Sequence, residues 1–195
     1  MIVLYHKPYR MLSQYNVNPD MPDQRVLPPE LAALQVAPIG RLDYDSEGLL
    51  LLTDQPQLER ALLAPERQCP KTYLVQVQGT PTDDTLAPLR DGTLTIRVGK
   101  KPHHCAPANA SILPQPPTTL WPRHPAVDPH SPTSWLTLTL TEGKNRQIRR
   151  MTAKLGYPTL RLIRQRIDTY TLEDLAPGEW RQVACNTQQQ ESPAQ

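Results

Sequence analysis

Residues 40–48 form a polar loop that carries three carboxylates in alternation: Asp43, Asp45 and Glu47. Arg41 stands two residues before Asp43, and the apolar run 49–53 follows the loop directly. A partly desolvated carboxylate that a neighbouring guanidinium keeps ionised can act as a base or a nucleophile. The same composition also suits an ordinary turn, in which Asp and Ser side chains bond the local backbone and Gly adopts unusual φ values. Both interpretations remain open from the loop alone.

A second candidate is Tyr73. Residues 71–77 alternate in polarity, and this alternation predicts a strand with Lys71, Tyr73, Val75 and Val77 on one face. An aromatic residue on a half-buried strand usually belongs to the core. Beside a basic surface it can instead stack on a nucleic-acid base.

Basic charge is concentrated between residues 143 and 167. This segment has no acidic residue and eight basic ones: Lys144, Arg146, Arg149, Arg150, Lys154, Arg161, Arg164 and Arg166. The rest of the chain carries 13 basic and 19 acidic groups, so the formal net charge of +2 hides a local excess. Exposed helices usually balance such charges at i, i+4. Because the segment offers no such partner, it predicts binding to a polyanion.

Several other chemistries lack their motifs. The chain contains neither a dinucleotide-binding nor a P-loop glycine motif, and no serine–histidine–aspartate arrangement is apparent. Three widely spaced cysteines do not suggest a disulfide framework. His103, His104 and Cys105 lie near His124 and His130, but a second close ligand pair at zinc spacing is missing. We therefore expect no cofactor and no metal.

The chain also lacks the signals of a membrane or secreted protein. No run approaches the ~20 apolar residues of a membrane span. The first ten residues, MIVLYHKPYR, lack the layout of a signal peptide. These features predict a soluble, cytoplasmic protein.

The elements that would position the candidate residues are short. We expect strands at residues 2–5, 36–39, 49–53, 71–77, 93–98, 135–141 and 158–167. We expect helices at 30–34, 56–63 (capped by Asp54), 83–90 (capped by Thr82) and 145–155 (ended by Gly156). Nine of the 23 prolines fall in 102–132, which should be mostly irregular. Strands and helices without a regular βα period predict an α+β domain with a mainly antiparallel or mixed sheet.

Four segments together resemble the motifs of the RNA pseudouridine synthases, in the branch that modifies ribosomal small- and large-subunit RNA. They are Lys7-Pro8, residues 40–53, residues 71–75 and residues 142–151. They occur in the family's order. Residues 121–123, 132–136 and 158–164 further resemble a subgroup that acts on a uridine of 23S ribosomal RNA. The resemblance implies uridine-to-pseudouridine isomerisation without a cofactor. The implied partner is 23S rRNA or a large-subunit assembly intermediate.

The resemblance assigns roles by position. Asp43 matches the catalytic aspartate, and Arg149 matches the basic residue that pairs with it. Arg41 matches the arginine that fills the place of the flipped uridine, and Tyr73 matches the tyrosine that stacks on the target base. Phosphate contacts would fall to Lys144, Arg146 and Arg150.

We further expect one catalytic domain, residues 1–186, with 102–132 as a Pro-rich connection and 187–195 as a disordered tail. Lys7-Pro8 lies so near the start that no separate N-terminal RNA-binding domain is expected. A monomer is expected as well. The alternative function is a non-catalytic rRNA-binding or ribosome-assembly protein on the same fold. A glycosidase-like hydrolase would need a second catalytic carboxylate, which is not evident.

Overall fold

The structure is a computed structural model that describes residues 1–127 and 132–184. The expected disordered tail, residues 187–195, lies outside the described residues. The strands are β1 (Ile2–Lys7), β2 (Ala37–Pro38), β3 (Glu47–Thr53), β4 (Lys71–Gln78), β5 (Thr95–Val98), β6 (Lys101–His104), β7 (Asn109–Leu113), β8 (Thr133–Leu140), β9 (Thr159–Ile167), β10 (Tyr170–Thr171) and β11 (Trp180–Val183). The helices are α1 (Pro29–Ala33), α2 (Pro56–Leu63), α3 (Ala87–Arg90) and α4 (Gln147–Lys154), with short 3-10 turns η1 (Pro65–Arg67) and η2 (Asp84–Leu86). Within the described ranges, no helix is long and apolar enough to cross a membrane.

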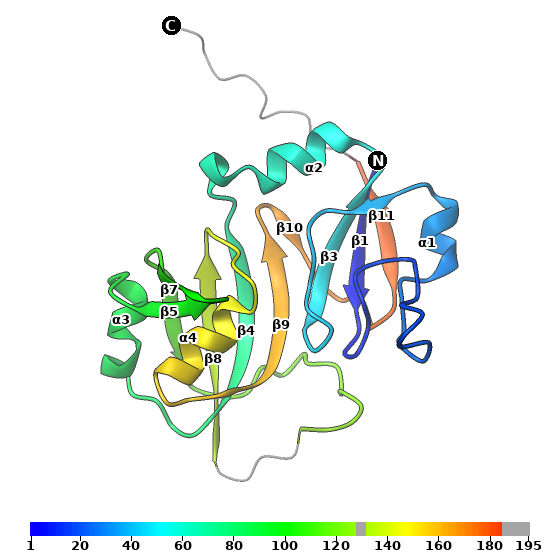
Figure 1. The fold of residues 1–195 in the computed structure, drawn as a ribbon. Helices are drawn as coiled ribbons and strands as arrows, with labels where there is room; N and C mark the ends of the chain where they lie inside the picture. The colour runs from blue at the N-terminus through cyan, green and yellow to red at the C-terminus, as the bar shows by residue number, and fades with distance from the viewer. Residues whose placement is uncertain (128–131, 185–195) are drawn as a thin grey trace, which may run out of the picture.

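One mixed sheet forms the framework of the molecule (Figure 1). Its strand order is β11-β1-β3-β9-β4-β8-β7, with β2 added to β3 and β10 to β9, while β5 and β6 form a separate hairpin. The ladders described for this sheet are antiparallel except between β3 and β9, where Glu47 pairs with Ile163 and Gly48 with Arg164. Two antiparallel groups of strands therefore meet at a short parallel seam. The expected α+β class with a mixed sheet is confirmed.

Alternation along β4 and β8 builds the core beneath α4. Tyr73, Val75 and Val77 lie in one buried cluster with Leu136, Leu138 and Leu140, as the alternation predicts. Ile148 and Met151 of α4 cover this cluster. In contrast, β1 and β3 are buried along their whole length. This explains the continuous apolar run of β3, because both of its faces pack against core clusters.

Two of the expected helix caps are wrong. Asp54 does not cap α2, because its Oδ1 accepts a hydrogen bond from the N-terminal amine of Met1 at 2.6 Å. The expected helix 83–90 is split into η2 and α3, and the Thr82 hydroxyl pairs with the Thr85 hydroxyl at 2.9 Å. The split falls at the first turn of α3, where Pro88 lies and cannot donate a helical hydrogen bond.

The Pro-rich connection is more ordered than its composition indicates. β6 begins at its N-terminal end, and β7 pairs with β8 over residues 109–113. β7 lies between Pro107 and Pro114 and contains no proline, while Pro102 lies in a two-stranded hairpin. The expectation of irregular structure therefore fails for the first part of 102–132. It is confirmed for residues 114–127, and 128–131 lie outside the described residues.

The basic helix begins two residues later than expected. Arg146 has a left-handed backbone (φ 52°), so α4 starts at Gln147. Its C-terminus ends as predicted at Gly156 (φ 91°). The amide of Gly156 donates to Ala153 O at 3.0 Å and that of Tyr157 to Thr152 O at 2.9 Å, which is the Schellman arrangement.

Candidate active site

The acidic loop, residues 40–48, lies at the seam of the sheet, and its last two residues begin β3. The amide of Ser46 donates to Asp43 O at 3.0 Å and closes a turn. Ser13, which is buried, holds the residue before Asp43: its Oγ donates to Leu42 O at 3.0 Å and accepts from the Leu42 amide at 3.1 Å. The residue before Asp43 is therefore held by a side chain 29 positions earlier in the chain. No local sequence pattern marks Ser13, so this contact was not predicted.

Gly48 fixes the exit of the loop. Its φ is 101°, and a Cβ at this position would come under 3.0 Å from the backbone of Arg164 on β9. Only glycine suits both requirements. Gly48 therefore allows the chain to pass from the loop into β3 at the point where β3 lies against β9.

Arg146, which directly precedes α4, and Arg149, which lies on α4, both contact Asp45. Arg146 donates through Nη1 and Nη2 to the two carboxylate oxygens of Asp45 at 2.7 and 2.8 Å. Arg149 donates to the main-chain oxygen of Asp45 at 2.7 Å, and its Nε lies 3.3 Å from Oδ2. Asp43 Oδ2 lies 3.9 Å from Nη1 of Arg146. The partner of Arg149 here is Asp45, which differs from the pairing with Asp43 that the resemblance implies.

The two aspartates therefore differ in their electrostatic environment. Burial alone would raise the pKa of Asp45, but the hydrogen bonds from Arg146 and the charges of both arginines outweigh it and hold this pKa below its usual value. The side chains of Asp43 and Asp45 are similarly exposed, at 31% and 29%. Among the described residues the carboxylate of Asp43 makes the one long ion pair and no hydrogen bond. The arginines therefore occupy the carboxylate of Asp45 and leave that of Asp43 without a hydrogen bond.

A second ion pair lies beneath the loop. Arg161 on β9 donates through Nε and Nη2 to the two oxygens of Glu47, each at 2.9 Å, and both side chains are buried. Its Nη2 also donates to Trp121 O at 2.8 Å. Arg164 is buried as well and donates to Leu49 O at 2.8 Å. These two arginines of the basic segment are therefore structural, and the acid that balances Arg161 comes from the loop.

Lys7 lies at the end of β1, paired with Gly48 across the ladder, and is fully buried. Its Nζ donates to Pro8 O at 3.0 Å and to Met11 O at 2.8 Å. Burial lowers the pKa of Lys7 to about 7, against the opposing charges of Glu47, Asp45 and Asp43. In the sequence Lys7 stands out only as part of a Lys-Pro element, and its buried position behind the loop was not predicted.

Tyr73 lies across the sheet from the loop. It pairs with Arg164 of β9, and Arg164 pairs with Gly48 of β3, so the three residues form one row. Two strand spacings correspond to about 10 Å between Tyr73 and Gly48. Tyr73 is 9% exposed and belongs to the core cluster, as its strand pattern first indicates.

The remaining candidate residues differ in how they are held. Arg41 and Lys144 are exposed. Arg150 is half-buried, and its guanidinium donates to Arg97 O and to Asn145 Oδ1. The structure thus brings Asp43, Asp45, Arg146 and Arg149 together, with Glu47, Arg161 and Lys7 behind them.

An anchored acidic loop on a mixed sheet, faced by a basic helix, agrees with the family that the sequence resembles. The family model described as RNA pseudouridylate synthase matches residues 1–154. The chain belongs to this family, and the pseudouridine synthase fold expected from the sequence is confirmed.

Individual relatives are similar over most of the chain. The chain is 47% identical to a ribosomal large subunit pseudouridine synthase E of Xanthomonas campestris, covering 93% of this chain and 94% of that protein. It is 43% identical to the protein of the same name in Vibrio vulnificus, covering 94% of this chain and 75% of that one. A crystal structure of a pseudouridylate synthase aligns with a TM-score of 0.73 at 28% identity, covering 94% of this chain and 70% of that chain.

Proposed function

We propose that this protein isomerises a uridine of 23S ribosomal RNA to pseudouridine, with Asp43 as the catalytic carboxylate. The observation that carries the proposal is the difference between the two aspartates. The carboxylate of Asp43 accepts no hydrogen bond among the described residues and lies on a loop fixed by Ser13 and Gly48, whereas that of Asp45 is occupied by Arg146 and Arg149. The names of the relatives supply the substrate class.

The reaction exchanges one glycosidic bond for another. Asp43 attacks the ribose or removes a proton from it while the N1–C1′ bond breaks and uracil detaches. The base turns, and the C5–C1′ bond forms as the Asp43–C1′ bond breaks or as Asp43 returns the proton to the ribose. The proton lost from C5 is replaced by one gained at N1. No electron or group is left over, so the isomerisation requires no redox partner.

The surrounding residues would serve binding. A base within a duplex must be flipped out before its ribose can be reached. Arg41, which is exposed, would fill the vacated place in the stack, and Tyr73 would contact the flipped base. Lys144, Arg146 and Arg150 would meet phosphates. Arg149, which contacts Asp45, would offset part of the negative charge of the loop that carries Asp43.

We propose residues 1–186 as one catalytic unit that binds RNA by itself, acts as a monomer and works in the cytoplasm, where ribosomal RNA is the substrate. The nine-stranded sheet, which includes both the first strand, β1, and the last described strand, β11, supports the single unit. The Pro-rich residues 102–132 lie within this unit, between β5 and β8.

The test is Asp43→Asn in the purified protein. We expect pseudouridine formation on a 23S rRNA fragment to fall by at least about a thousand-fold, as loss of a nucleophile or base does in other enzymes. RNA affinity should change little. Asp20→Asn, the same change at an exposed turn residue, is the control and should keep full activity. Turnover by Asp43→Asn equal to that of the control would refute the assignment.

A further inference from the structure

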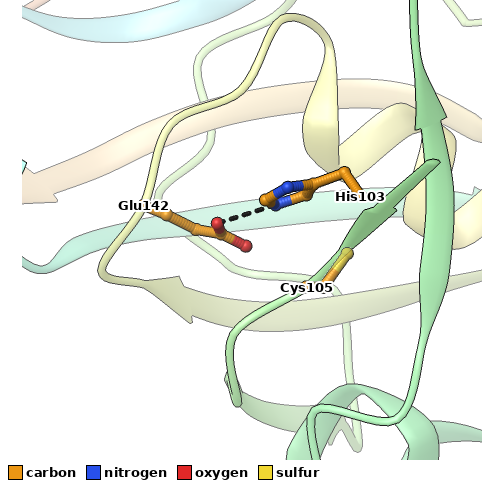
Figure 2. A group of neighbouring side chains, drawn as sticks. All are labelled: His103, Cys105 and Glu142. Atoms are coloured by element: carbon orange, nitrogen blue, oxygen red, sulfur yellow. Dashed lines mark hydrogen bonds and ion pairs between the residues drawn. The ribbon is translucent and has the colours of Figure 1, made fainter. Parts of the chain in front are cut away.

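Three potential metal ligands converge on the side of the molecule that carries the β5–β6 hairpin. They are His103 on β6, Cys105 just after β6, and Glu142 just after β8 (Figure 2). Their ligand atoms all lie within 4.8 Å of one another. Glu142 is 39 residues away from His103, so the sequence cluster of His and Cys could not indicate it.

We propose that His103, Cys105 and Glu142 form a binding site for a zinc ion, with water completing the coordination. Imidazole, thiolate and carboxylate are the three ligand types that zinc accepts, and zinc sites with three protein ligands keep a fourth position for water. A thiolate and a carboxylate would together neutralise the dication. This ligand set disfavours magnesium and calcium, which prefer oxygen ligands alone.

The geometry requires only small movements. Zinc with N and O ligands at about 2.0–2.1 Å and sulfur at about 2.3 Å in a tetrahedron separates its ligand atoms by about 3.3–3.6 Å. His103 Nε2 and Glu142 Oε2 are now 2.8 Å apart and share a hydrogen bond. Shifts of under about 1 Å would admit the ion. His103 and Glu142 have 23% and 19% of their side chains exposed, so an ion can reach them.

The carboxylate of Glu142 is already oriented by its surroundings. Its Oε1 accepts hydrogen bonds from the Ala106 amide at 3.0 Å and from Gln147 Nε2. Oε2 is thereby turned toward His103. Contacts of this type fix metal ligands in place and are part of a working site.

The third ligand, Cys105, is buried beside this carboxylate. Burial raises the pKa of the Cys105 thiol, and the charge of Glu142 adds to the rise. Binding of the ion would form the Zn–S bond and release the thiol proton to solvent.

Such an ion would tie the β5–β6 hairpin to the turn that leads into α4. This turn contains Lys144 and Arg146, and Gln147 at its end accepts a hydrogen bond from the Lys144 amide at 2.9 Å. The proposed site therefore lies beside the segment that carries the basic residues facing the acidic loop.

Cobalt(II) serves as the probe, because its bond to a thiolate gives a charge-transfer absorption band. The full-length protein is stripped with chelator and titrated with cobalt, and zinc is then added. All proteins carry Cys185→Ser, which removes the one thiol outside the described residues. We expect one equivalent of cobalt to bind with a thiolate band, and zinc to abolish that band. Absence of the band in the otherwise unchanged protein would overturn the proposal.

Matched variants identify the ligands. Cys105→Ser should lose the band, whereas Cys69→Ser, at another buried free cysteine, should keep it. His103→Ala should weaken cobalt binding by at least about ten-fold, since even outer partners of metal ligands contribute on the order of 10–100-fold. His104→Ala, at the exposed neighbour, should bind as the parent does.

Melting temperatures provide a second readout. A ligand that binds only the folded state raises the melting temperature. Zinc should therefore stabilise the parent and His104→Ala but not His103→Ala. A band that survives Cys105→Ser, or equal stabilisation of both histidine variants, would overturn the proposal.

Discussion

Asp43 and Asp45 stand two positions apart in the same loop and have different surroundings. Asp45 accepts the paired donors of Arg146 and a donor from Arg149, which fixes it as the anchor of the loop on α4. Asp43 keeps one ion pair at 3.9 Å, and the two aspartate side chains are similarly exposed, at 31% and 29%. The two residues therefore differ in their partners, and only the carboxylate of Asp43 is left without a hydrogen bond among the described residues.

Gly48 provides the first prediction at the scale of single residues. In Gly48→Ala the new Cβ would collide with the backbone of Arg164 at a φ of 101°. We expect the free energy of unfolding in urea to fall by about 3 kcal/mol or more. Gly143→Ala is the control, because a Cβ there meets nothing within 4 Å. It should change stability by no more than about 0.5 kcal/mol. Equal losses in the two variants would contradict the close approach of β3 and β9.

Lys7 provides a prediction of pH dependence. Its pKa is about 7 in the folded protein and has an ordinary value of 10.5, so the unfolded chain binds more protons between these pH values. The contribution of Lys7 to the free energy of unfolding should therefore increase as pH rises from 7 to 10, by up to about 1.4 kcal/mol per pH unit. Below pH 7 both states are protonated and this gain is absent.

Lys7→Met should remove that rise, whereas Lys154→Met, at an exposed lysine of α4, should retain it. Denaturant unfolding at a series of pH values measures the slopes. If the free energy of unfolding changed with pH in the same way in both variants, Lys7 would not be buried as a neutral group.

At the scale of elements, the basic segment is only partly free to bind RNA. Residues 143–167 contain no acidic residue, and for this reason we expected their basic side chains to lack ion-pair partners. The acids instead come from the loop, where Asp45 and Glu47 pair with Arg146 and Arg161. Periodicity predicted α4, its apolar face and its end at Gly156. It could not predict the two ion pairs, whose partners are separated by 101 and 114 positions in the sequence, because these pairs depend on how β3 and β9 meet.

The salt dependence of RNA binding tests the remaining basic residues. Each lost phosphate contact reduces the slope of log K against log salt by about 0.7–0.9. The double change Lys144→Gln with Arg150→Gln should therefore flatten the slope by about 1.4–1.8. The control pair, Arg67→Gln with Arg90→Gln, changes two arginines that form ion pairs with Asp168 and Asp83. A slope altered equally by both pairs would assign the effect to net charge.

The Pro-rich segment offers a further element-scale prediction. Arg161 donates hydrogen bonds both to the carboxylate of Glu47 and to the main-chain oxygen of Trp121. In the same segment, the guanidinium carbon of Arg123 lies 4.3 Å from the centre of the Tyr9 ring. Trp121 is thus fixed near the acidic loop with 43% of its surface exposed. Trp121→Ala should weaken RNA binding by about 1–3 kcal/mol, the value of one stacked base. Trp180→Ala, at the 38% exposed tryptophan of β11, should not. Comparable losses would exclude a specific role of Trp121.

At the scale of the whole molecule, two antiparallel groups of strands meet at β3 and β9, and the acidic loop enters the sheet at this seam. Local patterns predicted seven of the eleven strands in the described residues, and the loop itself. They did not predict β6, β7, β10 or β11. The seam, Ser13 behind Asp43 and the row from Gly48 to Tyr73 depend on strand order, which alternation does not encode. The motifs that resemble the family located the candidate residues, and the tertiary contacts distinguish Asp43 from Asp45.

The central claim is that Asp43 of this protein forms a pseudouridine in 23S rRNA. Pseudouridine mapping of rRNA from cells that lack the gene, complemented with the native protein, Asp43→Asn or Asp20→Asn, tests it most directly. We predict one 23S site that is lost on deletion, restored by the native protein and by Asp20→Asn, and not restored by Asp43→Asn. An unchanged 23S map on deletion, or restoration of the site by Asp43→Asn, would contradict the claim.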